Sequence, residues 1–345
     1  MSNAYPTVRR LGVALLAGLF LLGAAACSGD DGDSGADAST TTSDGAGDAV
    51  GDSGVLSVLA YNVAGLPAEI SGGNPGVAMP IISPLLNDYD IVLTQEDFDW
   101  WPDEGTIVDL GLDFVNYHER LRADATHEYQ SPRHPGPDAA GVDPESRPDL
   151  EIGDGIGIMA RHPLDDYAVQ AWAGCFGSLD TSDGGAADCP AMKGFRVATM
   201  DLGGTEVDVY SLHAEAGGTD EDQRLQAEDF EQLAAFIEEH SGDRALIIGG
   251  DTNLHTDDEH EDNGDGLDTE IWATFVARIG LTDACVATDC EDTGAIDKIA
   301  IRSSDAIELE VTGYERPQER FTDDEGGDLS DHVPVAVELA WRRLA

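Results

Sequence analysis

Residues 245–255 read ALIIGGDTNLH. The apolar run 245–248 is typical of a strand that is covered on both faces, and the two glycines after it allow a sharp turn or the close approach of a ligand. Asp251 and Asn253 would then project from the carboxyl end of the strand, where α/β sheets place ligand-binding side chains. The alternative is a solvated turn, because Gly, Asp and Asn are common turn residues. The rest of the chain decides between the two interpretations.

Other expected strands also end in polar side chains. Residues 55–62 alternate toward a strand that ends in Asn62, and residues 91–96 form an apolar strand that ends in Glu96. The further candidates are His213 after a strand at 206–212, Asp297 within a strand at 295–301, and the Ser330-Asp331-His332 triplet ahead of the final strand. One such residue is usually a solvated strand end. Several of them, each with apolar residues behind it, indicate a site.

The remaining elements favour one α/β domain over residues 55–345. Further strands are expected at 155–160, 193–198 and 307–311, and helices at 79–86, 220–240 and 269–279. We expect Thr269 to cap the last helix, and we interpret the acidic residues at the start of the 220–240 helix as solvated. No repeat and no linker divides this part of the chain.

Residues 120–154 show no periodicity and predict a long loop. The segment contains Arg120, Arg122, Arg133 and Arg147, although the whole chain has only 18 Lys and Arg residues. Contact with a phosphate or another part of a substrate is one interpretation of these arginines. An ordinary surface loop is the other.

The charge balance of the chain disfavours nucleic acid as a partner. The 345 residues include 69 acidic and 18 basic ones, for a formal net charge of −51. Residues 1–54 contribute −5 of this charge, which leaves −46 on residues 55–345. Such a charge opposes binding to a polyanion. The hydrophobic content of 41% is ample for a core.

The amino terminus has the layout of an export signal. Arg9 and Arg10 precede an apolar run at 11–22, and small residues lead to Cys27. Residues 1–26 therefore resemble a lipoprotein signal peptide that would leave Cys27 lipidated, with plain cleavage or an uncleaved anchor as alternatives. Residues 27–54 are acidic and rich in Ser, Gly and Asp, which predicts a disordered tether. We expect a protein that is secreted or held in the cell envelope by its lipid.

Four cysteines follow Cys27, and their even number in an exported chain favours disulfides. Pairing by proximity joins Cys175 to Cys189 and Cys285 to Cys290, which is one of three connectivities. Neither pair has the CxxC spacing of a zinc site.

The strand-end residues together resemble the endonuclease/exonuclease/phosphatase superfamily, which has the fold of deoxyribonuclease I. The similarity runs from about residue 55 to residue 341 and rests on these residues in family order: Asn62, Glu96, His213, Asp251, Asn253, Asp297 and the Ser330-Asp331-His332 triplet. It implies a four-layered α/β sandwich of two mixed sheets flanked by helices. The activity that it implies is metal-dependent hydrolysis of a phosphoester.

The resemblance also implies a role for each residue. Glu96 and Asn62 would hold Mg²⁺, with Asp331 beside the metal. His332 would be the general base that activates water, and Asp297 would hold its imidazole in position. The other implied roles are the orientation of the nucleophile or a share in metal binding for Asp251, and hydrogen bonds to phosphoryl oxygens for Asn253 and His213.

Two local motifs resemble those of secreted bacterial neutral sphingomyelinases. Residues 189–195 read CPAMKGF and follow Gly174-Cys175, and residues 212–216 read LHAEA, which is similar to the histidine motif of those enzymes. Met192 stands where a polar residue is common, and no aromatic hairpin for membrane insertion is visible.

We therefore expect an exported, monomeric, Mg²⁺-dependent phosphodiesterase with sphingomyelinase-like phospholipase C action on a phospholipid head group. A cationic choline suits an acidic site and could lie on Trp100, Trp101 or Trp172, although core packing is the alternative for these residues. A secreted nuclease is a second hypothesis, which high salt would make compatible with the charge. A non-catalytic binding lipoprotein is the third.

Overall fold

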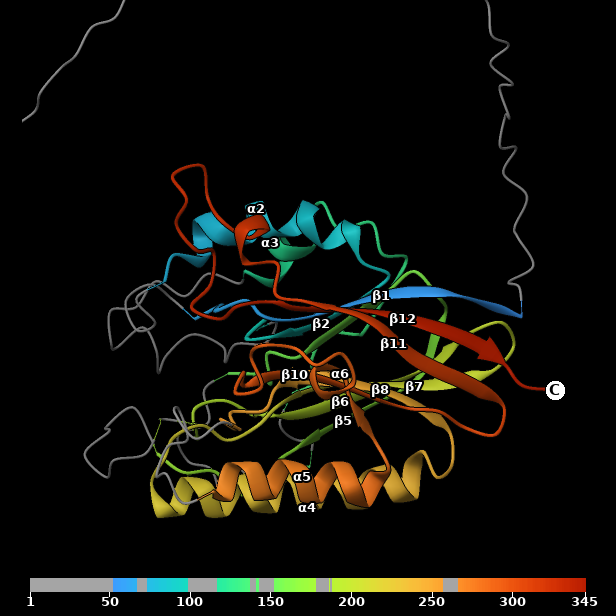
Figure 1. Ribbon diagram of the computed structural model, residues 1–345. Coiled ribbons are helices and arrows are strands. Elements are labelled where there is room, and N and C mark those ends of the chain that lie inside the picture. The colour runs from blue at the N-terminus through green and yellow to red at the C-terminus, as the bar shows by residue number, and fades with distance from the viewer. Residues whose placement is uncertain are drawn as a thin grey trace, which may run out of the picture. The chain divides into compact units, whose positions relative to one another are not determined.

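The polypeptide is arranged in four layers, two stacked β-sheets with helices on both outer faces (Figure 1). The computed structural model describes residues 52–66, 73–98, 117–136, 141–142, 152–177, 186, 188–256 and 266–345. The predictions on the signal peptide, Cys27, Trp100, Trp101, Arg147 and residues 27–51 of the tether lie outside these residues. The predicted tether is wrong at its end, because Ser53 and Gly54 belong to the first strand. Within the described ranges, no helix combines the length and the apolar character that crossing a bilayer requires.

Each sheet has six strands and mixes parallel with antiparallel pairs. The first sheet has the order β11 (Ile307–Glu315), β12 (Val335–Arg343), β1 (Ser53–Asn62), β2 (Ile91–Gln95), β4 (Gly157–Ala160) and β3 (Tyr129–Gln130). The second has the order β5 (Leu164–Ala171), β6 (Gly194–Asp201), β7 (Glu206–His213), β8 (Ala245–Asp251), β10 (Asp297–Arg302) and β9 (Thr282–Asp283). The expected four-layered α/β sandwich is confirmed.

Helices cover both sheets. The first sheet is covered by α2 (Pro75–Leu85) and α3 (His118–Arg122), and the second by α4 (Asp220–His240) and α5 (Leu267–Ile279) (Figure 1). The short helix α6 (Ala284–Ala287) follows β9, and 3₁₀ helices occupy Leu86–Asp88 and Gln318–Arg320.

Strand β8 shows why the opening stretch of sequence is apolar at every position. Ala245 and Ile247 point into the core between the two sheets, whereas Leu246 and Ile248 point into the core under α4 and α5. Successive side chains of a strand face opposite sides, so a strand with a layer on each face needs a continuous apolar run. The prediction of a doubly covered strand is confirmed.

Several sequence-based boundaries are wrong or incomplete. The predicted loop 120–154 includes the end of α3 and all of β3, because five-residue and two-residue elements are too short to show a period. Thr269 does not cap α5, since the helix begins at Leu267 after Gly266, which has a left-handed φ of 80°. Helix α2 begins at Pro75, four residues before its expected start. Strands β5 and β9 and helix α6 were not predicted from the sequence.

The acidic start of α4 is only partly solvated. Asp222 is buried and forms a capping box with Thr219, whose side chain accepts a hydrogen bond from the backbone nitrogen of Asp222. The predicted span of this helix and its buried apolar face are confirmed.

The two disulfides join the cysteines that are close in sequence. Cys175 pairs with Cys189, and Cys285 pairs with Cys290, as pairing by proximity predicts.

Candidate active site

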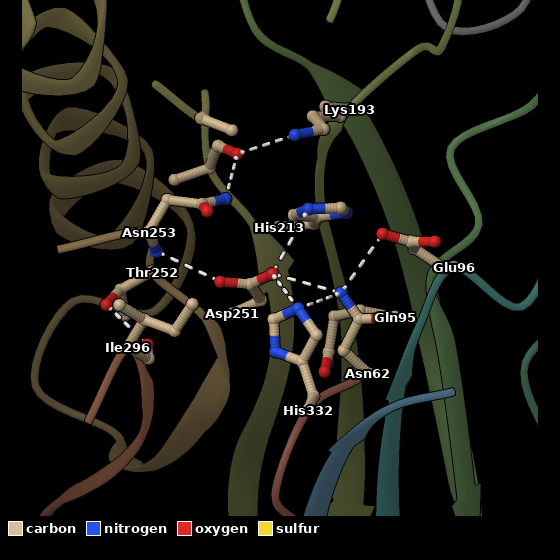
Figure 2. Close-up of polar contacts among 12 residues, drawn as sticks. Asn62, Gln95, Glu96, Lys193, His213, Asp251, Thr252, Asn253, Ile296 and His332 are labelled. Atoms are coloured by element: carbon tan, nitrogen blue, oxygen red, sulfur yellow. Dashed lines mark hydrogen bonds and ion pairs between the residues drawn. The ribbon is translucent and has the colours of Figure 1, made fainter. Parts of the chain in front are cut away.

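The strand-end residues meet at one edge of the stacked sheets (Figure 2). In the second sheet, the register pairs His213 with Asp251 and Asp251 with Asp297. In the first sheet, Asn62 ends β1 and Glu96 follows the parallel strand β2. Because the two sheets are stacked with these ends together, side chains from both sheets contact one another.

Asp251 is the centre of this cluster. Its Oδ2 atom lies 3.0 Å from the Asn62 amide nitrogen and 3.3 Å from Nε2 of His213, and its Oδ1 accepts a 3.0 Å hydrogen bond from the backbone nitrogen of Asn253. Burial by itself raises the pKa of Asp251, but the charges of His332 and Lys193 and the hydrogen bond from Asn62 outweigh it and hold this pKa below its usual value. The side chain is therefore a carboxylate at neutral pH.

His332 lies between two carboxylates in the loop before β12. Its Nδ1 is 2.8 Å from Asp297 Oδ2, and its Nε2 is 3.7 Å from Asp251 Oδ2 and 3.3 Å from the Asn62 amide nitrogen. Burial by itself lowers the pKa of His332, but Asp251 and Asp297 outweigh it and raise the pKa to about 10. Asp297 thus fixes the orientation of the ring, and Nε2 faces the centre of the cluster.

Ser330, the first residue of the predicted triplet, supports this loop. Its hydroxyl donates to the carbonyl oxygen of Asn62 at 2.7 Å and accepts from the backbone nitrogen of His332 at 3.1 Å. The hydroxyl therefore ties the loop that carries His332 to the end of β1.

Glu96 and Asn62 contact each other. The Asn62 atom that faces Glu96 is the side-chain nitrogen, however, and not the oxygen that a metal would need. The side-chain nitrogen of Asn62 lies 3.3 Å from Glu96 Oε1, while the side-chain oxygen Oδ1 of Asn62 accepts from the backbone nitrogen of Ala64 at 3.1 Å. Burial raises the pKa of Glu96, and the charge of Asp331 adds to this rise, against the opposing effects of His332 and Lys193.

A hard cation fits the carboxylates at this edge. Glu96 is partly exposed, and its carboxylate and that of Asp251 both lie against the same Asn62 nitrogen. Such a pair offers the oxygen ligands that Mg²⁺ prefers, next to solvent that can supply water ligands. Ligand atoms of Asp251, Asp297 and His332 also lie within 4.8 Å of one another. Hydrogen bonding and ion pairing already account for that proximity, so the partly exposed Glu96 is the better candidate for a cation ligand.

The other predicted residues lie around this centre. Asp331 is exposed and lines a cavity of about 330 Å³ whose wall includes Asn74 and Asp323. Asn253 has a left-handed φ of 51°, and its amide nitrogen donates to the carbonyl oxygen of Ala214 at 3.0 Å. The structure therefore places Asp331 at the rim and ties the Asn253 amide to the backbone.

His213 is buried beside Asp251. Burial and the nearby charge of Lys193 hold the pKa of His213 well below its usual value, so the ring is neutral. A neutral ring that donates from Nε2 to Asp251 keeps Nδ1 as an acceptor, and Nδ1 has no hydrogen-bond partner among the described residues.

Two functional candidates lacked an assigned role at the sequence level. The ammonium group of the buried Lys193 forms an ion pair with Asp188 and lies 3.3 Å from the carbonyl oxygen of Ala214. Burial by itself lowers the pKa of Lys193, but Asp188 and Glu215 outweigh it and raise this pKa. The signal was present, because Lys193 belongs to the CPAMKGF motif.

The second is Gln95, which precedes Glu96. Its side-chain nitrogen donates to the Ser211 hydroxyl at 3.0 Å, and this hydroxyl lies 3.3 Å from the carbonyl oxygen of Thr94. Gln95 therefore links the two sheets directly beneath the site.

The side chains of Trp172, Arg120 and Arg122 have partners other than the side chains of this cluster. Trp172 is buried against Phe195, and its indole nitrogen donates to the carbonyl oxygen of His213 at 2.7 Å, which confirms the core-packing interpretation. Arg122 is held by Asp97, and Arg120 lies over the ring of Tyr117. Arg133 is exposed.

Comparison with known proteins agrees with the motif resemblance. No known protein-family profile matches the chain. A protein of Mycobacterium tuberculosis (strain ATCC 25618 / H37Rv) named sphingomyelinase is 28% identical in an alignment of 309 positions that covers 83% of this chain and 52% of that protein. A putative neutral sphingomyelinase of Drosophila melanogaster is 25% identical in an alignment of 308 positions that covers 84% of this chain and 61% of that protein. The chain thus spans about half the length of the mycobacterial relative.

Solved structures share the fold. Sphingomyelinase C from Streptomyces griseocarneus aligns with a TM-score of 0.54 at 20% identity, over 83% of this chain and 99% of that one. Beta toxin from Staphylococcus aureus aligns with a TM-score of 0.53 at 17% identity, over 82% and 99%. A humanized D. rerio TDP2 aligns with a TM-score of 0.54 at 16% identity, over 83% and 98%. The chain therefore has the deoxyribonuclease I-like fold of the endonuclease/exonuclease/phosphatase superfamily, and in sequence it is similar to proteins named sphingomyelinase.

Proposed function

We propose that this chain is a Mg²⁺-dependent phosphodiesterase that hydrolyses a phospholipid head group, with sphingomyelin as its substrate and phosphocholine as a product. The observation that carries this proposal is the His332 imidazole, held by Asp297 on one nitrogen and facing Asp251 and Asn62 with the other. The similarity to proteins named sphingomyelinase supports the choice of substrate.

In this proposal, His332 removes a proton from water. Asp297 accepts from Nδ1, so Nε2 is the nitrogen that can take the proton at the centre of the cluster. Asp297 then stabilises the imidazolium that forms. A His332 pKa of about 10 means that the free ring is already protonated at neutral pH. A cation bound beside Glu96 would offset part of the negative charge of Asp251 and Glu96 and would so lower the pKa of His332.

The site has the donors for such a cation. Glu96 would be the main ligand, with Asp251 close by and Asp331 at the rim. Bound there, Mg²⁺ would neutralise charge on the non-bridging oxygens of the phosphate. A double mutant of the structural neighbour beta toxin has been crystallised with bound magnesium ions, which is consistent with this assignment.

The charge of the protein supports a cationic head group over nucleic acid. The net charge of −51 repels a polyanion, whereas a choline group tolerates acidic surroundings. We also infer export, because the two disulfides suit an oxidising compartment. Lipidation of Cys27, membrane contact through that lipid and a monomeric state stay predictions.

A substrate panel tests the proposal. The purified chain would be incubated with sphingomyelin, phosphatidylcholine, inositol phosphates and duplex DNA, each with Mg²⁺ and with EDTA. We expect phosphocholine release from sphingomyelin that EDTA abolishes. Degradation of DNA without phosphocholine release would contradict the lipid assignment and favour a nuclease.

Variants of two histidines test the catalytic role within the same assay. His332→Ala should lower turnover by roughly 10²- to 10⁴-fold, the usual contribution of a general base, with a thermal unfolding temperature near that of the wild type. The matched control is His162→Ala, because this partly buried histidine follows the end of β4 away from Glu96 and should keep full activity. Unchanged turnover in His332→Ala would exclude it as the base, and a chain inactive in every assay would support a binding lipoprotein.

A further inference from the structure

The backbone at Glu96 is held in an uncommon conformation. Its φ is 54°, in the left-handed region that side-chain-bearing residues other than Asn and Asp rarely adopt. Such conformations persist where the surrounding structure enforces them, and they are frequent at functional sites. The contacts that enforce this one therefore bear on the position of the Glu96 carboxylate.

Hydrogen bonds fix the chain on both sides of Glu96. The backbone nitrogen of Val63 donates to the carbonyl oxygen of Gln95 at 2.9 Å, and the backbone nitrogen of Asp97 donates to that of Gly155 at 2.7 Å. Gly155 also packs closely, since a Cβ atom there would lie 3.0 Å from the Glu96 Cα atom. The peptide groups next to Glu96 are thus tied to two different loops.

The side chain of Asp97 provides the strongest attachment. It is buried, and its Oδ2 lies 2.5 Å from Arg122 Nη1 and accepts from the Thr94 hydroxyl at 2.9 Å. Its Oδ1 lies 2.9 Å from Nδ1 of His118. Gly157 leaves room for this cluster, because a Cβ atom there would meet Thr94, Arg122 and Asp97 at 2.3, 2.7 and 2.9 Å.

Helix α3 supplies both basic partners. His118 and Arg122 are four residues apart and so lie on one face of the helix. The intervening Leu121 is fully buried in the core under α2, which anchors α3 against the sheet. The partners of Asp97 are therefore rigidly placed.

We propose that Asp97, Arg122 and His118 form a positioning unit for Glu96, and that the Asp97–Arg122 ion pair sets the affinity of the site for Mg²⁺. The inference rests on the proposed function, in which Glu96 is the main metal ligand. In this proposal the three side chains act through the backbone of residue 96 and not by direct contact with the metal. Their effect is to hold residue 96 in the left-handed conformation that turns its carboxylate toward Asn62.

A second buried ion pair offers a matched control. Asp208 is fully buried, lies 2.8 Å from Arg244 Nε and accepts from the Thr199 hydroxyl at 2.8 Å. Asp97 has the same kinds of partner, an arginine and a threonine. Asp208, however, precedes His213 by five residues on β7, which places it about 17 Å away along the strand. Loss of either carboxylate should lower stability, but only loss of Asp97 should change metal binding.

The experiment measures Mg²⁺ binding to the full-length chain by calorimetry, without substrate. We expect Asp97→Asn and Arg122→Gln to weaken Mg²⁺ binding by roughly 10- to 100-fold, the usual effect of removing a group that orients a metal ligand. Arg122→Lys, which keeps a positive charge, should bind Mg²⁺ with an affinity closer to that of the wild type. Asp208→Asn should bind Mg²⁺ like the wild type despite a lower unfolding temperature. If Asp97→Asn does not fold, the two Arg122 variants carry the test.

The measurements distinguish a failure of the positioning role from a failure of the metal assignment. Wild-type affinity in Asp97→Asn and Arg122→Gln, with binding abolished in Glu96→Gln, would overturn the positioning role and leave the proposed function intact. Equal losses in Asp97→Asn and Asp208→Asn would overturn it as well, because general destabilisation would then explain both. A wild-type chain that binds no Mg²⁺ would overturn the metal assignment and this inference with it.

Discussion

At the scale of single residues, Gly65 decides whether the backbone at Glu96 has room. A Cβ atom at position 65 would lie 2.0 Å from the Glu96 carbonyl oxygen and 3.4 Å from the Met79 methyl group. The distance to the Glu96 carbonyl oxygen is far below any van der Waals contact. Because that oxygen belongs to the backbone, it cannot move aside as a flexible side chain could. A side chain at this position therefore requires the loop that carries Glu96 to move.

We predict that Gly65→Ala lowers both stability and Mg²⁺-dependent turnover. The overpacking should cost about 2 kcal/mol of unfolding free energy. Turnover should fall further than this loss of folded protein explains, because Glu96 is displaced. Urea denaturation and steady-state assays at saturating and limiting Mg²⁺ would measure the two effects.

Gly313→Ala is the control for this change. Its Cβ atom would meet the Cβ atom of Glu338 at 3.4 Å, at the edge of ordinary contact, on β11. The unfolding free energy and the turnover of Gly313→Ala should both stay near those of the wild type. A Gly65→Ala protein that matched Gly313→Ala in both assays would contradict the proposed crowding of Glu96.

At the scale of elements, helix α4 connects the two strands that carry His213 and Asp251. Strands β7 and β8 are parallel neighbours, so the chain must cross back over the sheet between them, and α4 makes that crossing. Thr219 and Asp222 close the amino terminus of α4 with a capping box. The cap fixes where the helix begins and thereby how the loop leaves His213.

We predict that Thr219→Ala lowers the unfolding free energy by about 1 kcal/mol through loss of this cap. Catalysis should change little at temperatures where the protein is folded. Thr274→Ala is the matched substitution, since Thr274 is exposed in the middle of α5 and alanine is the better helix former there. Chemical denaturation of both variants is the measurement, and equal stabilities would show that the cap contributes nothing.

At the scale of the whole molecule, net charge is the dominant feature. The chain has 69 acidic and 18 basic residues, and several of the arginines are used in ion pairs such as Arg278 with Glu231 and Glu238. Most of the negative charge is therefore left without a basic partner in the sequence. Its mutual repulsion opposes the compact state.

We predict that the unfolding temperature rises as NaCl increases from about 0.01 M to 1 M, because the screening length falls from roughly 30 Å to 3 Å. Replacing exposed carboxylates should weaken this dependence. A suitable variant combines Glu128→Gln, Asp305→Asn and Glu310→Gln, all at exposed positions. Differential scanning calorimetry across the salt series is the test, and an unfolding temperature that does not respond to salt would contradict it.

The sequence predicted elements best where the pattern was long. The apolar run at the start of β8 is unbroken, and helix α4 keeps its helical period over 21 residues. Helix α3 was missed because five residues show no period, and tertiary contacts hold it in place: Leu121 in the core and Arg122 on Asp97.

By itself, the sequence determined which residues end the strands and therefore which side chains are candidates for catalysis, because alternation, apolar runs and strand-terminal polar residues are local features. It also indicated the four-layered fold through the order of those motifs. Only the tertiary structure decided their partners: that Asn62 faces Glu96 with its nitrogen, that His332 lies between Asp251 and Asp297, and that Trp172 is buried. The physical reason is that the contacts of this cluster join residues far apart in the chain, up to 270 positions for Asn62 and His332, and their geometry depends on how two sheets stack.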